Sequence, residues 1–191
     1  MTSSKIDNRS ICDISCDTRD SPKMLVRLLG TQDAPSFHSL RLCGLREAPT
    51  SFASSYEEEV DRSADVIESQ LATRNDRGVF GAFEGSRLIG IAGLGRENRR
   101  KLNHKAFLWG VYVAPDMRGS GVSKTLVAEV LAFARSIPEI TQVNLTVNAN
   151  NPAAIHVYTS LGFEQFGRER NSLMVDGHMY DEVHMSLHFG R

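Results

Sequence analysis

Cysteine is scarce in this chain and follows no structural pattern. There are only three, Cys12, Cys16 and Cys43, an odd number at irregular spacing. A disulfide framework needs paired cysteines and a structural zinc site needs complete ligand pairs, so the spacing favours neither. The Cys12 and Cys16 pair leaves a weak metal or redox role as an alternative to two free thiols. Free thiols are typical of a reducing compartment, and we therefore expect a cytoplasmic protein without a bound metal.

An excess of charge of either sign is also missing. The 191 residues include 22 basic and 23 acidic ones, for a formal net charge of −1. Proteins that bind nucleic acid or anionic membranes usually have a basic excess, so neither partner is expected. Basic residues do gather between Arg96 and Lys105, where a solvated loop is the simpler interpretation. No apolar run reaches the length needed to cross a membrane.

The N-terminal residues lack both an apolar run and any periodicity. They are rich in Ser, Asp, Thr and Arg, so we expect a flexible extension over residues 1–22 and no signal peptide. Residues 23–191 have the length and apolar content of a single globular domain.

Within that domain the hydrophobic periodicity alternates between strand and helix. Strands are expected over residues 24–29, 79–83, 88–94, 107–113, 142–147, 163–170 and 178–187. Helices are expected over residues 34–46, over 55–71 with a break near Asp61, between the glycine turn at 119–121 and Pro138, and over 152–161. This order predicts an α+β fold of the layered α/β type, with a mixed, mostly antiparallel sheet and helices on both faces.

One predicted strand contains a glycine in its interior. Phe107, Trp109, Val111 and Val113 alternate along it, and alternation predicts that all four lie on one face. Gly110 stands among them without a side chain to pack. Such a glycine often marks a β-bulge or the close approach of another backbone, and a simple packing glycine is the alternative.

A glycine-rich turn leads from this strand into a helix. Arg118-Gly119-Ser120-Gly121 follows Pro115 and precedes the helical apolar pattern. A turn of this kind presents free backbone N–H groups at the positive end of a helix, which suits a phosphate or pyrophosphate. Arg118 would add a cation close to the phosphates. The third glycine of a dinucleotide fingerprint and the lysine of a Walker loop are both missing, and a plain strand-to-helix turn is the alternative.

Two segments of the sequence carry a family resemblance. The run VAPDMRGSGVS (residues 113–123) resembles the pyrophosphate-binding loop, Arg/Gln-x-x-Gly-x-Gly/Ala, of the GNAT superfamily of acyl-CoA-dependent N-acetyltransferases. The run NANNPAAIHVYTSLGF (residues 148–163) is similar to that family's Asn-x-x-Ala-x-x-x-Tyr-x-x-x-Gly-Phe segment. The resemblance covers roughly residues 23–188. Ser123 departs from the usual Gly or Ala, but its side chain is small enough for the loop to form.

The resemblance implies acetyl-CoA, or another short acyl-CoA, as the acyl donor. The residues whose backbone would hold the pyrophosphate are Arg118, Gly119, Ser120, Gly121, Val122 and Ser123. The backbone of Val111 and Val113 would pair with the pantetheine arm, and Gly110 would form the bulge that separates this strand from the next. Asn151, by position a helix N-cap, would also contact CoA.

The same resemblance points to catalytic residues. Tyr158 matches the family's tyrosine and would act as the general acid that protonates the departing thiolate, with ordinary core packing as the alternative. Glu58, the middle of three consecutive glutamates, is a candidate general base or acceptor contact, although such a run is usually a solvated face. Tyr112 is a further candidate base, and His178 and His184 are candidates to line the acceptor pocket. A backbone N–H near Val111 would stabilise the oxyanion.

These observations predict an N-acetyltransferase that moves an acetyl group from acetyl-CoA to a primary amine by direct attack on the thioester. The acceptor would be an amine-bearing small molecule or peptide, and the protein a monomer or homodimer. A non-catalytic CoA-binding sensor or interaction module on the same fold is the principal alternative. An enzyme that binds a nucleotide phosphate is a weaker one, because no Walker lysine or metal-binding carboxylates accompany the loop.

Overall fold

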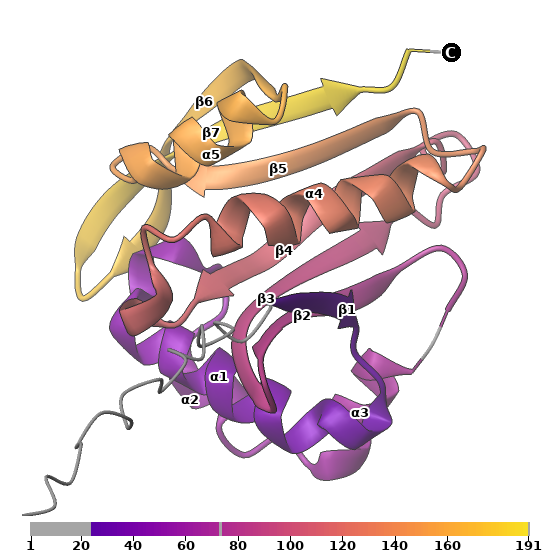
Figure 1. Cartoon of the computed structure of the whole chain (residues 1–191). Coiled ribbons are helices and arrows are strands. Elements are labelled where there is room, and N and C mark those ends of the chain that lie inside the picture. Colours follow the sequence, from indigo (N-terminus) through magenta and orange to yellow (C-terminus); the bar gives the residue numbers. More distant parts are fainter. Residues whose placement is uncertain (1–23, 73, 191) are drawn as a thin grey trace, which may run out of the picture.

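A computed structural model describes residues 24–72 and 74–190 of the chain. Its centre is a seven-stranded sheet with the strand order β1-β2-β3-β4-β5-β7-β6 (Figure 1). The strands are β1 (Leu25–Leu28), β2 (Gly78–Glu84), β3 (Arg87–Arg96), β4 (Lys105–Val113), β5 (Gln142–Asn148), β6 (Glu164–Val175) and β7 (His178–His188). The predicted layered α+β fold is confirmed. The extension predicted over residues 1–22 lies outside the described residues.

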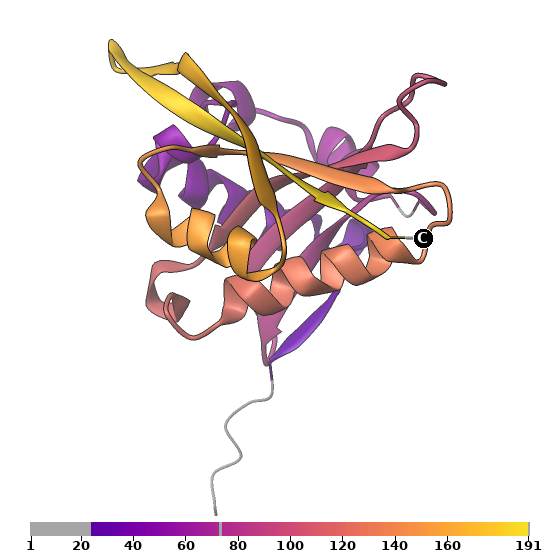
Figure 2. The ribbon, with the colours of Figure 1, turned by 90° about the horizontal axis from the view of Figure 1, so that it is seen from above.

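Helices cover both faces of the sheet. They are α1 (Ala34–Glu47), α2 (Tyr56–Glu59), α3 (Ala64–Leu71), α4 (Val122–Arg135) and α5 (Pro152–Ser160), with short 3-10 turns at η1 (Thr31–Asp33), η2 (Pro49–Ser51) and η3 (Pro115–Met117). The helices α4 and α5 lie on one face, and α1 to α3 lie on the other (Figure 2). No helix in the described part of the chain is long and apolar enough to span a membrane.

Each face of the sheet has its own hydrophobic core. On one face α4 buries Leu126, Val127 and Val130 completely, because helical spacing places them on a single stripe. On the other face Phe37 of α1 and Ile67 of α3 belong to a second core. The sheet is therefore held from both sides, which fixes the strand ends where the candidate site lies.

The only parallel neighbours in the described sheet, β4 and β5, pair over a short distance. Their register joins Lys105, Ala106 and Phe107 to Gln142, Val143 and Asn144 and goes no further. β4 continues to Val113 and β5 to Asn148 without pairing to each other. We call the segments 108–113 and 145–148 the unpaired β4–β5 stretch. The edge of β4 that faces β5 there has backbone groups available to another partner.

The strand β4 contains a β-bulge at Gly110. Its pairing with β3 shifts register between Ile91 and Gly93, and Gly110 has a φ of +64°, a conformation that favours glycine. The bulge overturns the prediction that four alternating residues of this strand share one face. Trp109 packs on the side of α1 to α3, whereas Val111 packs on the side of α4.

The extra residue of the bulge explains this correction. Phe107 lies with Trp109, because their rings occupy the spaces left by the missing side chains of Gly95 and Gly93. Val113 belongs to the same core as α4. Successive side chains of a strand point to opposite faces of the sheet. One inserted residue therefore moves every later side chain to the opposite face from the one that simple alternation predicts.

The other helices and strands end where the sequence predicts or extend beyond the predicted residues. The helical segment breaks near Asp61 as predicted, since α2 ends at Glu59 and α3 begins at Ala64. The strand expected to end at residue 170 continues to Val175, because β6 and β7 form one long hairpin. That hairpin turns at Asp176 and Gly177, whose φ values of 49° and 75° fit the predicted tight turn.

Candidate active site

The glycine turn between β4 and α4 presents unpaired backbone donors. Gly119 and Gly121 have φ values of +76° and +85°, and apart from their chain neighbours no atom lies within 4 Å of where a Cβ on either glycine would be. Among the described residues, the amides of Gly119, Ser120 and Gly121 donate to no protein acceptor. The first hydrogen bond of the helix runs from the Thr125 amide to the carbonyl oxygen of Gly121. Free donors at the start of a 14-residue helix fit an anion such as a pyrophosphate.

The side chain of Arg118 forms an ion pair with Glu47 of α1. Its Nη1 and Nη2 donate to the carboxylate of Glu47 at 2.7 and 2.6 Å, and its Nε donates to the carbonyl of Val113 at 3.1 Å. The backbone amide of Arg118 donates to the carbonyl of Pro115 at 3.3 Å. Arg118 therefore ties the loop to α1 and to the end of β4, and its charge is compensated by Glu47. That Arg118 adds a positive charge beside the phosphates stays a prediction, and its guanidinium is already paired with Glu47 in this structure.

Tyr112 belongs to the same network. Its hydroxyl donates to Glu47 at 2.6 Å, and burial, followed by that hydrogen bond, raises the pKa of Tyr112 to about 12. The hydrogen bonds from Arg118 and Tyr112 lower the pKa of Glu47 below its usual value. A phenol that already donates to a carboxylate is not a free base, so the structure does not favour Tyr112 in that role.

Tyr158 lies on the α4 side of the unpaired β4–β5 stretch. It sits on α5 in the same core as Val113, and its ring packs edge-on against Phe163 at 5.9 Å. Its side chain makes no hydrogen bond to any described residue. Burial raises the pKa of Tyr158 to about 12. The hydroxyl is thus protonated and uncommitted, which are the properties that a general acid requires.

The helix that carries Tyr158 is fixed at its start by Asn151. The Asn151 side-chain oxygen accepts a hydrogen bond from the Ala154 amide at 3.0 Å, and Pro152 occupies the first helical position. The predicted N-cap is confirmed. Gly162, with a φ of +93°, follows the end of the helix. These caps orient α5 without help from a ligand.

Two of the three glutamates of α2, Glu58 and Glu59, already accept hydrogen bonds in this structure. Glu58 accepts a hydrogen bond from the Ser55 amide at 2.7 Å and is exposed, so it caps its own helix. Glu59 is the buried member, at 4% exposure, and pairs with Arg41 at 2.9 Å and Arg62 at 3.6 Å. Burial raises the pKa of Glu59, but its hydrogen bonds and the charges of both arginines bring that pKa below the usual value.

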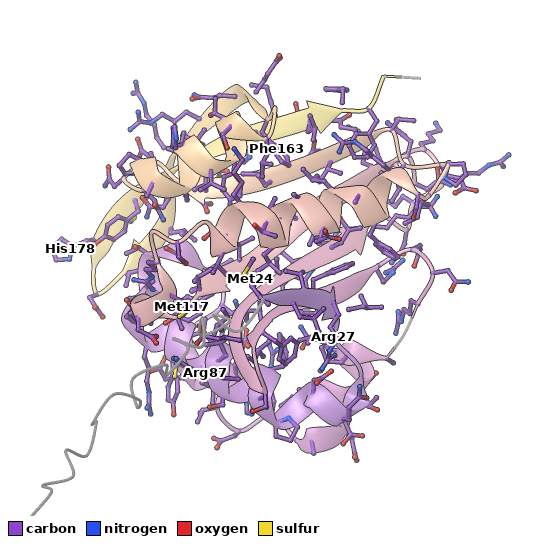
Figure 3. All side chains as sticks on the ribbon, viewed as in Figure 1. Met24, Arg27, Arg87, Met117, Phe163 and His178 are labelled. Carbon is purple, nitrogen blue, oxygen red and sulfur yellow. The ribbon has the colours of Figure 1, made fainter. Side chains whose placement is uncertain are left out.

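The candidate histidines lie on the β6–β7 hairpin. His178 stands at the outer margin of the molecule beside the hairpin turn (Figure 3). His184 contacts Glu169 at 3.2 Å and is paired across the sheet with Thr146 of β5. His178 is therefore remote from the glycine turn at the start of α4, whereas His184 is beside β5. Among residues 24–72 and 74–190, no three His, Cys, Asp or Glu side chains gather as metal ligands.

A family model settles what the loop, the unpaired strands and Tyr158 have in common. Residues 44–163 match the model of the acetyltransferase (GNAT) family, and this range contains all three features. The chain belongs to the GNAT acetyltransferase family. The match begins inside α1 and ends at Phe163, so the β6–β7 hairpin lies beyond it.

Two curated proteins are similar to parts of this GNAT chain. An N-alpha-acetyltransferase RimI of Mycobacterium tuberculosis is 35% identical over 98 residues, covering 51% of this chain and 58% of that protein. A spermidine N(1)-acetyltransferase of Vibrio cholerae is 27% identical over 84 residues, covering 44% of this chain and 49% of that protein. The matches thus span about half the length of these relatives.

Solved structures share the fold of this GNAT chain at low sequence identity. An acetyltransferase of the GNAT family from Streptococcus pneumoniae has a TM-score of 0.78 at 20% identity, covering 87% of this chain and 100% of that one. A putative acetyltransferase from Salmonella typhimurium, solved with its cofactor acetyl-CoA, has a TM-score of 0.74 at 17% identity, covering 88% and 95%. At these identities the likeness concerns the fold.

Sequence reasoning found the backbone features of this site and missed its ion pairs. The roles of Glu47, Glu59 and Arg41 depend on partners that are distant in sequence, such as Arg118, which is 71 positions from Glu47. The one signal in the sequence is Glu59 itself, within a run of three glutamates that is typical of a solvated face.

Proposed function

We propose that this protein is an acetyl-CoA-dependent N-acetyltransferase that acetylates a primary amine by direct attack on the thioester. One arrangement carries the proposal. The free amides of Gly119 to Gly121, the unpaired edge of β4 and the uncommitted hydroxyl of Tyr158 all border the unpaired β4–β5 stretch. The curated relatives are named for acetylation of amines, which supports the same class of reaction.

The donor would be held mainly by backbone groups. The amides of residues 119–123 suit the pyrophosphate because they are free and lie at the positive end of α4. The backbone of Val111 and Val113, beyond the last β4–β5 pair, suits the amides of the pantetheine arm as an added strand. Asn151 lies at the start of α5, where its side-chain nitrogen could contact the donor while its oxygen caps the helix.

The reaction exchanges one bond to the acetyl carbon for another. The neutral amine forms the C–N bond, the C–S bond breaks, the amine gives up a proton and the thiolate gains one. At pH 7, releasing the proton of a lysine-like ammonium costs about 4–5 kcal/mol. Glu58 already accepts a hydrogen bond from the Ser55 amide, and Glu59 accepts hydrogen bonds from Arg41 of α1, so we propose that this proton leaves through water. The backbone N–H of Val111 would stabilise the developing oxyanion.

Tyr158 would give the thiolate its proton. Its pKa of about 12 keeps it protonated throughout the physiological range. A thiol in water has a pKa of about 8.5, but the same burial that disfavours the phenolate of Tyr158 also disfavours a thiolate beside it. When Tyr158 gives its proton to the thiolate, a desolvated phenolate replaces a desolvated thiolate. The transfer is therefore less unfavourable than the pKa values of the two groups in water suggest.

Thiol release from acetyl-CoA tests the proposal. The amines should include a peptide N-terminus, lysine, a polyamine, an aminoglycoside and small amino compounds. Turnover with at least one class is expected, together with acetyl-CoA binding in the absence of amine. Tight acetyl-CoA binding without turnover for any class would favour a non-catalytic CoA-binding module instead.

A further inference from the structure

Arg41 is a buried arginine with one donor group that the protein does not use. It lies on α1 with 6% exposure, and its Nε and Nη2 donate to Glu59 at 3.1 and 2.9 Å. Its guanidinium also stacks over the ring of Phe52 at 4.5 Å. Nη1 is the one fully buried side-chain nitrogen or oxygen of the described residues that has no hydrogen-bond partner. Leaving such a donor unsatisfied is unfavourable, so its retention calls for an explanation.

The unused nitrogen faces the β-bulge of β4. Apart from chain neighbours, Nη1 is the only atom within 4 Å of the place where a Cβ on Gly110 would stand, at a distance of 3.6 Å. Gly110 thus puts bare backbone, without a side chain, in front of the guanidinium. Because the bulge lies within the unpaired β4–β5 stretch, the guanidinium adjoins the proposed site of acetyl transfer.

The charge around Nη1 determines which ligand group fits. Arg41 and Arg62 both contact the single carboxylate of Glu59, so the three side chains carry a net charge of +1. A carboxylate would accept a charge-assisted hydrogen bond from Nη1 and balance this charge. A neutral carbonyl would accept the hydrogen bond but would leave the net charge of +1 uncompensated. An ammonium group would be repelled by that charge.

We propose that Arg41 binds a carboxylate of the acceptor, so that the substrates of this enzyme are small amines that also carry a carboxyl group, such as amino acids. This inference rests on the proposed N-acetyltransferase function and narrows its acceptor class. Nη1 is enclosed without ligand, so the acceptor enters with a shift of the segment that carries Phe52, whose ring covers the same guanidinium. Polyamines are excluded as preferred acceptors.

Matched acceptor pairs test the proposal by activity. A series of α- and ω-amino acids, each paired with its own primary amide, is compared by kcat/KM for the neutral amine, because amidation also lowers the amine pKa. At least one acid should exceed its amide by tenfold or more. Arg41→Lys, which keeps a positive charge beside Glu59 but lacks the second guanidinium nitrogen, should remove this preference. Arg46→Gln, an exposed arginine of α1 that stacks on Tyr56, is the control and should retain it.

Binding provides a second readout that does not require turnover. Trp109 is the only tryptophan of the chain and precedes Gly110, so its fluorescence reports on the bulge. With CoA bound, N-acetylated amino acids should bind at least tenfold more tightly than their amides, and Arg41→Lys should abolish the difference. If Arg41→Lys does not fold, the neutral pair Arg41→Gln with Glu59→Gln replaces it.

The outcomes separate this inference from the function on which it rests. Equal use and equal binding of acids and amides, or a preference for polyamines, would overturn the carboxylate site while leaving the acetyltransferase intact. A carboxylate preference that persists in Arg41→Lys would also overturn it. Carboxylate-dependent binding without turnover of any amine would uphold the site and reject the enzymatic function.

Discussion

Glu47 and Arg118 form a two-pronged ion pair, at 2.6 and 2.7 Å, that joins the end of α1 to the glycine turn before α4. The hydroxyl of Tyr112 reaches the same carboxylate at 2.6 Å. Glu47 therefore connects α1, the helix that carries the proposed acceptor-binding Arg41, to the glycine turn that we propose binds acetyl-CoA. The side chain of Arg118 holds the glycine turn in position. The free backbone amides of that turn are then the groups that we propose bind phosphate.

The bracing role of Arg118 predicts coupled effects on stability. Arg118→Gln and Glu47→Gln should each lower the free energy of unfolding, and a double-mutant cycle should give a coupling of about 0.2–1 kcal/mol, because the pair is partly exposed. Acetyl-CoA affinity should fall less than tenfold in Arg118→Gln. Urea unfolding and calorimetry measure the two quantities.

The pair formed by Arg27 and Asp33 is the matched control. It has the same two-pronged geometry, at 2.7 Å for both hydrogen bonds, but no tyrosine on its carboxylate. Its removal should leave acetyl-CoA affinity unchanged. A loss of a hundredfold or more in Arg118→Gln, without coupling to Glu47, would instead identify Arg118 as a direct phosphate ligand.

Replacing a loop glycine should abolish donor binding. Gly121→Glu places a side chain and a negative charge where the phosphates would lie, and it forces a residue with a Cβ into a φ of +85°. Gly177→Glu is the control, because Gly177 has a φ of +75°, equally empty surroundings and a place in the turn of the β6–β7 hairpin. Both variants should lose about 1–2 kcal/mol of stability. Calorimetry that finds unchanged CoA affinity in Gly121→Glu would reject the loop assignment.

Removing the hydroxyl of Tyr158 should slow turnover and spare binding. Tyr158→Phe keeps the ring in its place against Phe163 and loses no hydrogen bond within the described residues. We expect kcat at saturating amine to fall about tenfold or more, with the Kd for acetyl-CoA nearly unchanged. Tyr56→Phe, which removes a hydroxyl bonded to Arg46, is the control and should have wild-type kcat. Equal kcat in Tyr158→Phe and wild type would remove Tyr158 from the mechanism.

The raised pKa of Tyr158 predicts the form of the pH profile. The protonated phenol is the active form, and with a pKa of about 12 it stays protonated until the solution is strongly alkaline. Activity should therefore show no alkaline decline below about pH 11. The kcat/KM for the amine should rise about tenfold per pH unit below the amine pKa, as the neutral form increases. Initial rates on a stable protein check this, and a decline centred near pH 9–10 would be inconsistent with a buried acid.

Local signals predicted the parts of the site that depend on neighbouring residues. Gly119 and Gly121 indicated a turn with positive φ, and Asn151 followed by Pro152 indicated a capped helix that starts where α5 begins. Both features are set by backbone geometry and one or two adjacent side chains, so the sequence contains what is needed to infer them.

The parts that could not be predicted depend on distant contacts or on an inserted residue. The interior glycine at position 110 predicts a bulge, but alternation alone does not show where the count changes, so the face occupied by Val111 does not follow from the sequence. Arg118 pairs with a glutamate 71 positions away, and Arg41 with one 18 positions away. Such pairings follow from how α1 packs on the sheet, which the sequence pattern leaves undetermined.

The stoichiometry of products tests the central claim most directly. The protein is incubated with acetyl-CoA and each amine class, and free CoA thiol and acetylated amine are both quantified. The account predicts that for at least one amine the two products appear in equal amounts, and that Tyr158→Phe slows both equally. Acetyl-CoA binding at the loop, lost in Gly121→Glu, with no acetylated product from any amine would contradict it.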